Sequence, residues 1–343
     1  MTKQIVLFLY LLLSVAAARA IPTRLYDAEV LSSNRITSLC QDSQGYIWVG
    51  TEYGLNKFDG GHFTQYYSDD ANPQSLADDI VRRLLVCSDG TLWIATNRGV
   101  QRYSRLSDSF ETVAFGESLT ANINDILETP SGKVWLLSAA DGVFEVDAAA
   151  MKARPVEAVN RRLALHSEAD NMYLDSKGRL WVSDRDEGLQ MVDTRSDRCR
   201  SYGRDALGDL RAADIIEDAH RRLTIVTYGA VLQLNEQSGA FETLATFPRC
   251  AVQQLYRDSS GRLLISTSGN GLLEVVHEAG RQGVVNAFDR LHVSRLTDGA
   301  PTEQLKVHAY LEDHSGNLWI GCMQRGLLLV STRPSPFRFL PLS

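Results

Sequence analysis

Residues 36–60, ITSLCQDSQGYIWVGTEYGLNKFDG, contain three short apolar runs separated by two polar turns. Runs of this length, bounded by turn residues, are typical of β-strands joined as hairpins. Gly45 and Gly54 fall in the two turns, where a tight hairpin favours a residue that tolerates positive φ. The stretch therefore predicts three consecutive antiparallel strands.

The same pattern returns along the rest of the chain, with a turn residue three positions before each tryptophan or its replacement. These positions are Trp48, Trp93, Trp135, Trp181, Thr224, Leu264 and Trp319, and successive ones lie 40 to 55 residues apart. A repeat of this length made only of short strands is typical of a β-propeller, in which neighbouring blades bury each other's faces. Helical solenoids have a similar period, but they need a helical apolar spacing that these runs lack.

We therefore expect an all-β fold, a seven-bladed β-propeller of four-stranded antiparallel blades, over residues 21–333. The innermost strand of each blade precedes the turn residue, and the second strand carries the tryptophan position. We expect the tryptophans to pack between adjacent blades, where a large ring fills the gap. The fifth copy is the most altered, with Arg221 and Thr224 in the glycine and tryptophan positions.

Two features of the repeat predict irregular blades. The seventh copy lacks an outer strand, which either Thr23–Ala28 or Phe337–Leu340 could supply. We favour the N-terminal segment, because it would close the ring and remove a sheet edge. The additional residues between Glu278 and Leu296 predict a longer outer hairpin or loop on the sixth blade.

The N-terminus has the pattern of a secretory signal peptide. Lys3 precedes an apolar run from Ile5 to Leu13, and Ala18-Arg19-Ala20 is a small-x-small cleavage site. The alternative is a membrane anchor, for which the run is short. We expect residues 1–20 to be removed and the chain to be exported to the periplasm or secreted, without a direct membrane span. Residues 334–343 are expected to form an exit strand or tail.

Composition and motifs exclude several function classes. The net charge is −7 and no run of basic residues occurs, so we expect no nucleic-acid partner. The five cysteines are distant from one another and odd in number, which predicts buried free thiols rather than disulfides or a metal site. The sequence shows no metal-binding, cofactor-binding or catalytic motif. Residues 184–188 resemble a calcium loop only weakly, and a charged hairpin is the simpler interpretation.

The candidate ligand site is the funnel around the propeller axis, where the inner strands begin. Two positions in each repeat vary sharply in chemistry, most of them polar or charged, while the apolar position between them does not. Ten residues before the turn position stand Arg35, Ile80, Asn122, Glu168, Arg211, Ala251 and Lys306. Eight residues before it stand Thr37, Arg82, Asn124, Asp170, Ala213, Gln253 and His308. Such side chains suit recognition of hydroxyl and carboxylate groups, although solvated strand ends would show the same composition.

The segment QDSQGYIWVGTEYGLNKFDGGHFTQYY resembles the two-component regulator propeller repeat, with its pattern D-x-x-G-x-[IL]-W-[IV]-G-T followed by GL-x-[KR]-[FY]. That repeat builds the periplasmic sensor region of hybrid two-component systems in Bacteroidetes. The resemblance covers essentially the whole expected mature chain and is weakest over residues 221–224 and the blade-six insertion. Full sensors of the family usually have two propellers, a β-sandwich domain, a membrane helix, a histidine kinase, a receiver and a helix-turn-helix output.

The resemblance implies a periplasmic propeller that senses glycans or their breakdown products without a kinase of its own. Its partners would be an oligosaccharide and further sensor domains or a histidine kinase on another chain. One alternative is a secreted propeller lyase or hydrolase, in which Arg82, Glu168, Asp170 and His308 would have to converge. Another is a non-functional remnant of a longer sensor.

Overall fold

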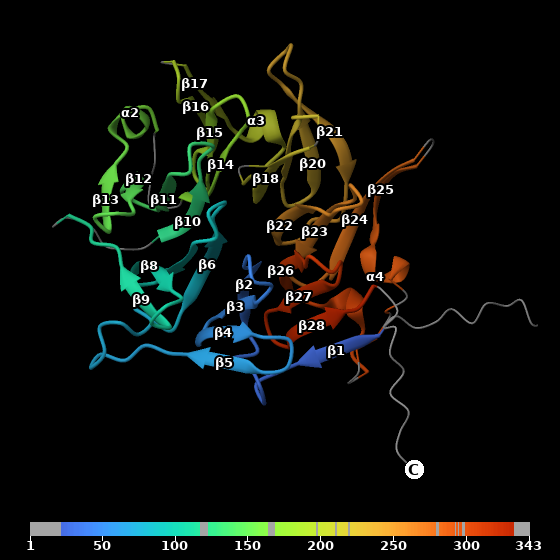
Figure 1. Cartoon of the computed structure of the whole chain (residues 1–343). Helices are drawn as coiled ribbons and strands as arrows, with labels where there is room; N and C mark the ends of the chain where they lie inside the picture. The colour runs from blue at the N-terminus through green and yellow to red at the C-terminus, as the bar shows by residue number, and fades with distance from the viewer. Residues whose placement is uncertain are drawn as a thin grey trace, which may run out of the picture.

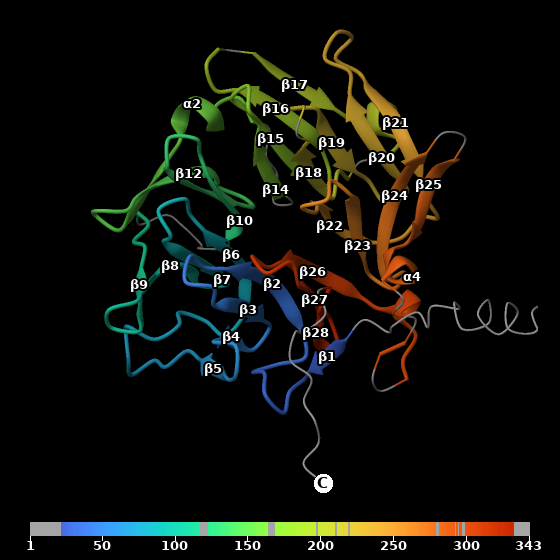
Figure 2. The ribbon, with the colours of Figure 1, turned by 45° about the vertical axis from the view of Figure 1, so that its right-hand side comes forward.

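The computed structural model describes residues 22–116, 123–163, 169–196, 198–209, 211–218, 220–278, 281–291, 293, 295–296 and 299–332. Within these residues, seven four-stranded antiparallel sheets stand as blades around a common axis (Figures 1 and 2). The expected seven-bladed propeller is therefore confirmed. The expected signal peptide and the tail at residues 334–343 lie outside the described residues.

The first strand of each blade lies nearest the axis and the last lies farthest from it. Blade 1 comprises β2 (Ile36–Gln41), β3 (Ile47–Thr51), β4 (Gly54–Phe58) and β5 (Phe63–Tyr66), and blade 2 comprises β6 (Val81–Val86), β7 (Leu92–Thr96), β8 (Gly99–Ser104) and β9 (Ser109–Thr112). Blade 3 comprises β10 (Ile123–Glu128), β11 (Val134–Ser138), β12 (Gly142–Asp147) and β13 (Lys152–Pro155), and blade 4 comprises β14 (Ala169–Leu174), β15 (Arg179–Asp184), β16 (Gly188–Asp193) and β17 (Cys199–Tyr202). Blade 5 comprises β18 (Asp214–Glu217), β19 (Leu223–Val226), β20 (Ala230–Leu234) and β21 (Phe241–Thr246), and blade 6 comprises β22 (Val252–Arg257), β23 (Leu263–Thr267), β24 (Leu272–Glu278) and β25 (Arg281–Asn286). Blade 7 comprises β26 (Val307–Glu312), β27 (Leu318–Cys322), β28 (Gly326–Val330) and β1 (Thr23–Tyr26). Short helices are α2 (Glu157–Asn160), α3 (Arg204–Leu207), α4 (Ala287–Arg290) and the 3₁₀ turn η1 (Thr302–Gln304).

The N-terminal strand closes the ring, as the sequence predicted. β1 pairs antiparallel with β28, with Thr23 opposite Val330 and Tyr26 opposite Leu327. The Tyr26 ring is buried and stacks on Trp319 with ring centroids 6.1 Å apart. Because β1 comes from the start of the chain and β28 from near its end, this pairing joins the first and last repeats and leaves blade 7 complete.

The tryptophans pack between blades, as predicted. Trp48 of blade 1 belongs to one buried cluster with Val81, Leu92 and Tyr103 of blade 2. The indole rings fill the gap between neighbouring sheets, and burial of large apolar rings is a main source of core stability. Trp135, Trp181 and Trp319 make the corresponding contacts with blades 4, 5 and 1.

The insertion in blade 6 supplies a buried aromatic side chain where the repeat lacks its tryptophan. Leu264 stands in the tryptophan position, and the residues after Glu278 form β25 and the short helix α4. Phe288 of α4 is fully buried in the same cluster as Leu264 and Val307. The longer outer hairpin is therefore confirmed, and it also supplies an aromatic ring to the interface between blades 6 and 7.

The five cysteines are all free thiols, but they do not share one environment. Cys87 and Cys322 are buried, whereas Cys40 and Cys250 are partly buried. Cys199 is exposed on β17, so the expectation of a buried thiol is wrong there. The cause is its place on an outer strand of blade 4, which has no further strand beyond it.

Candidate functional site: an axial cavity

Six of the seven inner strands are interrupted by a bulge at the second residue. In β2 the register jumps from Ile36 to Ser38, so Thr37 has no partner on β3. The same shift occurs in β6, β10, β14, β22 and β26. A bulge leaves one residue outside the ladder and re-aims its side chain. In blade 5 the strand begins at Asp214, and Ala213 takes the equivalent place directly before it.

The bulge residues converge on one cavity. The cavity has a volume of about 600 Å³. We call the seven residues that line it from the inner strands the bulge ring: Thr37, Arg82, Asn124, Asp170, Ala213, Gln253 and His308. These are the residues eight positions before the turn in each repeat. That whole set therefore faces a common space at the axis.

The second predicted set behaves differently, because it lies before the inner strands begin. Of its polar members, Arg211 lines the cavity, whereas Arg35 and Lys306 are not among the lining residues. Arg35 instead forms an ion pair with Glu52, with 2.7 Å between Nε and Oε2. Asn122 and Glu168 lie outside the described residues. Six of the ten predicted ligand-binding residues thus meet in the cavity.

Several lining residues were not predicted from the sequence. Glu52, Asn97 and Arg185 come from the tips of the hairpins between second and third strands. These tips fold back beside the starts of the inner strands, as shown by the Asn97 N–H donating to the Ile80 carbonyl at 3.2 Å. The hairpin glycines marked the turns in the sequence. Nothing in the pattern showed that the turns reach the axis.

A network of charges occupies one side of the cavity. The Asp170 carboxylate of the bulge ring forms ion pairs with Arg211 and with Arg185, the latter at 3.2 Å from Nε. Arg211 also binds the Tyr228 hydroxyl and lies over its ring, 5.3 Å from the centroid. On blade 2, Arg82 Nε donates to Asn97 Oδ1 at 2.6 Å. The cavity therefore holds oriented donors from several blades.

Arg83 forms the floor of the cavity. It lines both the axial cavity and a deeper pocket of about 240 Å³, and its Nε lies 3.4 Å from Asp125 Oδ1. Burial raises the pKa of Asp214, in the deeper pocket, to about 6. Burial and, to a lesser extent, the Arg83 charge lower the pKa of His308 to about 4. The imidazole of His308 is therefore neutral at pH 7.

Some buried polar atoms at the axis have no hydrogen-bond partner within the described part of the chain. They include Thr37 Oγ1, Asn171 Oδ1 and Arg211 Nε. All three residues line the cavity. Because an unsatisfied buried polar group is costly, such atoms favour contact with water or a polar ligand.

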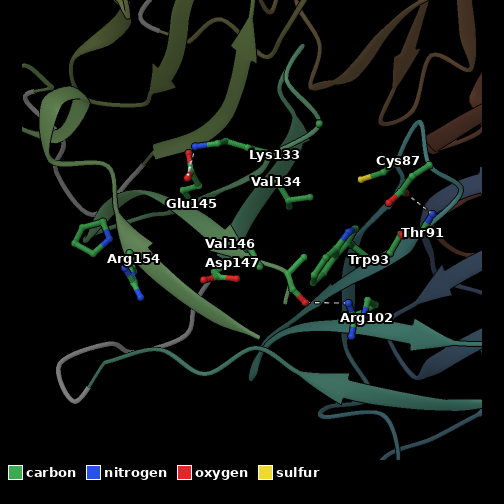
Figure 3. A pocket seen from close by; sticks show the side chains of 14 residues that line it. Cys87, Thr91, Trp93, Arg102, Lys133, Val134, Glu145, Val146, Asp147 and Arg154 are labelled. Atoms are coloured by element: carbon green, nitrogen blue, oxygen red, sulfur yellow. Dashed lines mark hydrogen bonds and ion pairs between the residues drawn. The ribbon is translucent and has the colours of Figure 1, made fainter. Parts of the chain in front are cut away.

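A second pocket, of about 560 Å³, lies between blades 2 and 3 and is shown in Figure 3. Three of its charged side chains are held in ion pairs, since Lys133 Nζ lies 2.7 Å from Glu145 Oε1 and Arg102 binds Glu111. Cys87 here replaces the aspartate that binds the tryptophan indole in blades 1, 4 and 7. The pocket therefore follows from a local change in the repeat, whereas all seven blades build the axial cavity.

The described residues contain no group of three or more His, Cys, Asp or Glu side chains arranged to hold a metal ion. Residues 184–188 form the β15–β16 turn, in which Asp184 Oδ1 accepts from the N–H groups of Asp186 and Glu187. Among the described helices, none is long and apolar enough to cross a membrane. Arg82, Asp170 and His308 reach the cavity from three different blades, and no hydrogen bond or ion pair joins them in the part of the chain described.

Comparison with known proteins finds one matching family model and several solved structures with a similar propeller fold. Residues 30–53 match the model of the two component regulator propeller family. No curated protein matches the sequence. The extracellular domain of the hybrid two component system BT3049 from B. thetaiotaomicron is similar in structure, with a TM-score of 0.75 and 21% identity over 92% of this chain and 42% of that one. The corresponding domain of BT4673 from the same organism is also similar, with a TM-score of 0.74 and 17% identity over 92% of this chain and 44% of that one. This chain thus spans less than half the length of those two structures.

Virginiamycin B lyase from Staphylococcus aureus has a similar fold at 12% identity, with a TM-score of 0.67 over 90% of this chain and 99% of that one. At this identity the likeness extends to the propeller architecture alone. The matched repeat at residues 30–53 contains the start of blade 1, including the Asp42 turn and Trp48. The protein is therefore a seven-bladed β-propeller in which residues 30–53 match the two component regulator propeller family.

Proposed function

We propose that this chain is the ligand-sensing propeller of a two-component regulatory system, that it acts outside the inner membrane, and that it responds to glycans or their breakdown products. The observation that carries the proposal is the bulge ring, in which six of the seven repeats direct polar side chains of different kinds into one cavity. The repeat family and the similarity to extracellular sensor domains support the regulatory role. The signal-peptide pattern supports export.

The mechanism requires that the ligand bind two arrangements of the sensor with different affinity, because only a differential affinity shifts an equilibrium. Binding across the ring would connect several blades through one ligand. The signal would then pass to further sensor domains or to a histidine kinase. An enzymatic role is less well supported, because the Asp170 carboxylate is already paired with Arg211 and Arg185.

A thermal-shift screen of the purified chain against oligosaccharides tests the proposal. A ligand at one hundred times its Kd adds about 2.7 kcal/mol to the stability of the folded state. We expect at least one oligosaccharide to raise the melting temperature, and Asn124→Ala to reduce the rise. A folded protein that responds to no saccharide would contradict the proposal.

A further inference from the structure

The axial cavity carries more positive than negative charge. Four arginines line it, Arg82, Arg83, Arg185 and Arg211, against the carboxylates of Glu52 and Asp170. Arg185 and Arg211 share Asp170, and Glu52 is paired with an arginine outside the lining. Because the chain as a whole has a net charge of −7, this positive charge is a local property of the cavity. A cleft lined by one sign of charge concentrates ions of the opposite sign.

Arg82 is the lining arginine whose charge is least compensated. Its Nε is held by the neutral amide oxygen of Asn97 at 2.6 Å, and no carboxylate pairs with it within the described residues. Asn97 thereby orients the guanidinium while leaving its two terminal nitrogens for another acceptor. A guanidinium presented in this way suits bidentate binding of a carboxylate or sulfate group.

An exposed aromatic pair stands on blade 1, beside the hairpin tip that also carries the cavity-lining residue Glu52. Tyr53, at the tip of the β3–β4 hairpin, is 59% exposed, and its ring centroid lies 5.7 Å from that of Tyr67. The next residue, Gly54, donates its N–H to the Asp79 carbonyl at 2.6 Å. The hairpin tip is thereby fixed next to Ile80, which lines the cavity. Exposed aromatic rings offer a flat apolar surface with a polar edge, to which the C–H face of a pyranose ring is complementary.

We infer that the ligand is an acidic oligosaccharide whose carboxylate or sulfate binds Arg82 in the axial cavity while an adjacent sugar ring packs on Tyr53. The inference rests on the proposed function and specifies the ligand class of the same site. The arginine selects the charge, and the tyrosine pair distinguishes a saccharide from a bare anion. Arg83 adds positive charge at the cavity floor, although Asp125 partly offsets it.

Isothermal titration of the whole purified chain tests the inference. The probes are uronic-acid tetrasaccharides from pectate, alginate and hyaluronan, each compared at constant ionic strength with its carboxyl-reduced counterpart and with sodium sulfate. We expect at least one acidic tetrasaccharide to bind ten-fold or more tightly than its reduced counterpart and than sulfate. Arg82→Gln should lower its affinity by about 10- to 100-fold, the range for loss of a charge-assisted bond, and abolish the preference. Tyr53→Ala should weaken the acidic and reduced forms by a similar factor.

Arg195→Gln is the matched control, because it removes the same charge from an exposed position at the opposite end of blade 4, next to the Gly178 turn. It should leave both affinities unchanged. Equal binding of acidic and reduced forms, or a preference that survives Arg82→Gln, would overturn the inference. If only neutral saccharides bind, the inference fails and the proposed function stands. If no saccharide of either kind binds, the proposed function fails and the inference fails with it.

Discussion

Trp48 donates its indole N–H to Asp42 Oδ2 at 3.0 Å, and both side chains are buried. The other oxygen of Asp42 accepts the N–H groups of Gln44 and Tyr46 in the turn that precedes the tryptophan strand. One carboxylate therefore joins the turn to the ring that fills the gap between blades. The same bond recurs in blades 4 and 7, at 2.9 Å in each.

Asp42→Ala should lower the free energy of unfolding by about 3 kcal/mol, because it leaves the buried Trp48 N–H and two turn N–H groups without their acceptor. The control is Asp258→Ala in blade 6. There Oδ2, the carboxylate oxygen that binds the indole in blade 1, accepts from Arg262 Nε instead. Arg262 is 31% exposed and can be solvated, so the loss should be smaller. Urea unfolding at pH 7 measures both values. Equal losses would show that the indole bond does not contribute as described.

Gly326 is the position at which the ring closure is most sensitive to a single methyl group. It adopts φ 80°, and a Cβ atom there would overlap the carbonyl oxygen of Tyr26 on β1. Gly261 has a similar φ of 86°, but a Cβ there meets nothing within 4 Å. Gly261→Ala should cost only the strain of a left-handed residue, about 1 to 2 kcal/mol.

Gly326→Ala should cost clearly more than Gly261→Ala, because β1 must move away from β28 as well. Thermal unfolding of the two variants measures the difference. Increased protease cleavage near residues 23–26 in Gly326→Ala alone would locate the effect. Identical melting temperatures would indicate that β1 does not hold the ring closed.

His308 and Asp214 give opposite pH dependences over the same range. Asp214 has a pKa of about 6 in the folded protein and about 3.9 when unfolded, so its contribution to stability falls as pH rises from 4 to 6. His308 has a pKa of about 4 when folded and about 6.5 when unfolded. The unfolded chain then binds more protons between pH 4 and 6.5, so the contribution of His308 rises with pH.

His308→Gln should remove the contribution to the unfolding free energy that rises with pH. The contribution of Asp214, which falls with pH, should remain. Relative to the variant, the unchanged protein should gain about 3 kcal/mol of unfolding free energy between pH 4 and 6.5. Urea unfolding of both proteins at a series of pH values measures this difference. Parallel curves would contradict the burial of a neutral imidazole in the cavity.

Cys199 should be the one thiol that reacts rapidly in the folded protein. It is exposed, whereas burial raises the pKa of Cys87 and Cys322 to about 12 and also raises that of Cys40 and Cys250. A thiol reagent at pH 8 should label one equivalent quickly and all five only after unfolding. Cys199→Ser should abolish the fast phase. A fast phase that persists would place a second reactive thiol at the surface.

The repeat pattern was sufficient to predict the blades, because a turn glycine, a tryptophan position and a hairpin glycine recur with the period of one sheet. It was not sufficient to predict which side chains take over the packing and hydrogen bonding of the tryptophan in blades that lack it. Phe288 of α4 takes up space beside Leu264, and no spacing in the sequence connects these two residues. Arg222 and Arg262 likewise bind Asp218 and Asp258 in the blades without a tryptophan.

The bulge ring could be predicted because its residues vary in chemistry while the neighbouring apolar position does not. The set two residues earlier varies in the same way, yet Arg35 and Lys306 are not among the lining residues. The two sets differ in that only the bulge ring stands at the bulge position of the inner strands. A bulge is a feature of strand register, which cannot be recognised in a single sequence. Arg83 was not predicted for a related reason. It follows the bulge and lines both pockets, but in the sequence it appears as part of an ordinary strand.

The central claim is that ligand binds in the axial cavity, and blocking that cavity tests it most directly. Gln253 is a half-buried member of the bulge ring whose side chain is bonded only to Ser268 Oγ, at 3.0 Å, within the described residues. The measurement is the melting temperature of the unchanged protein and of Gln253→Trp, with and without a saturating concentration of the tightest-binding saccharide from the screen. We predict that the two proteins melt within a few degrees of each other without ligand, and that only the unchanged protein is stabilised by it. An equal rise in both would place the ligand elsewhere and contradict the account.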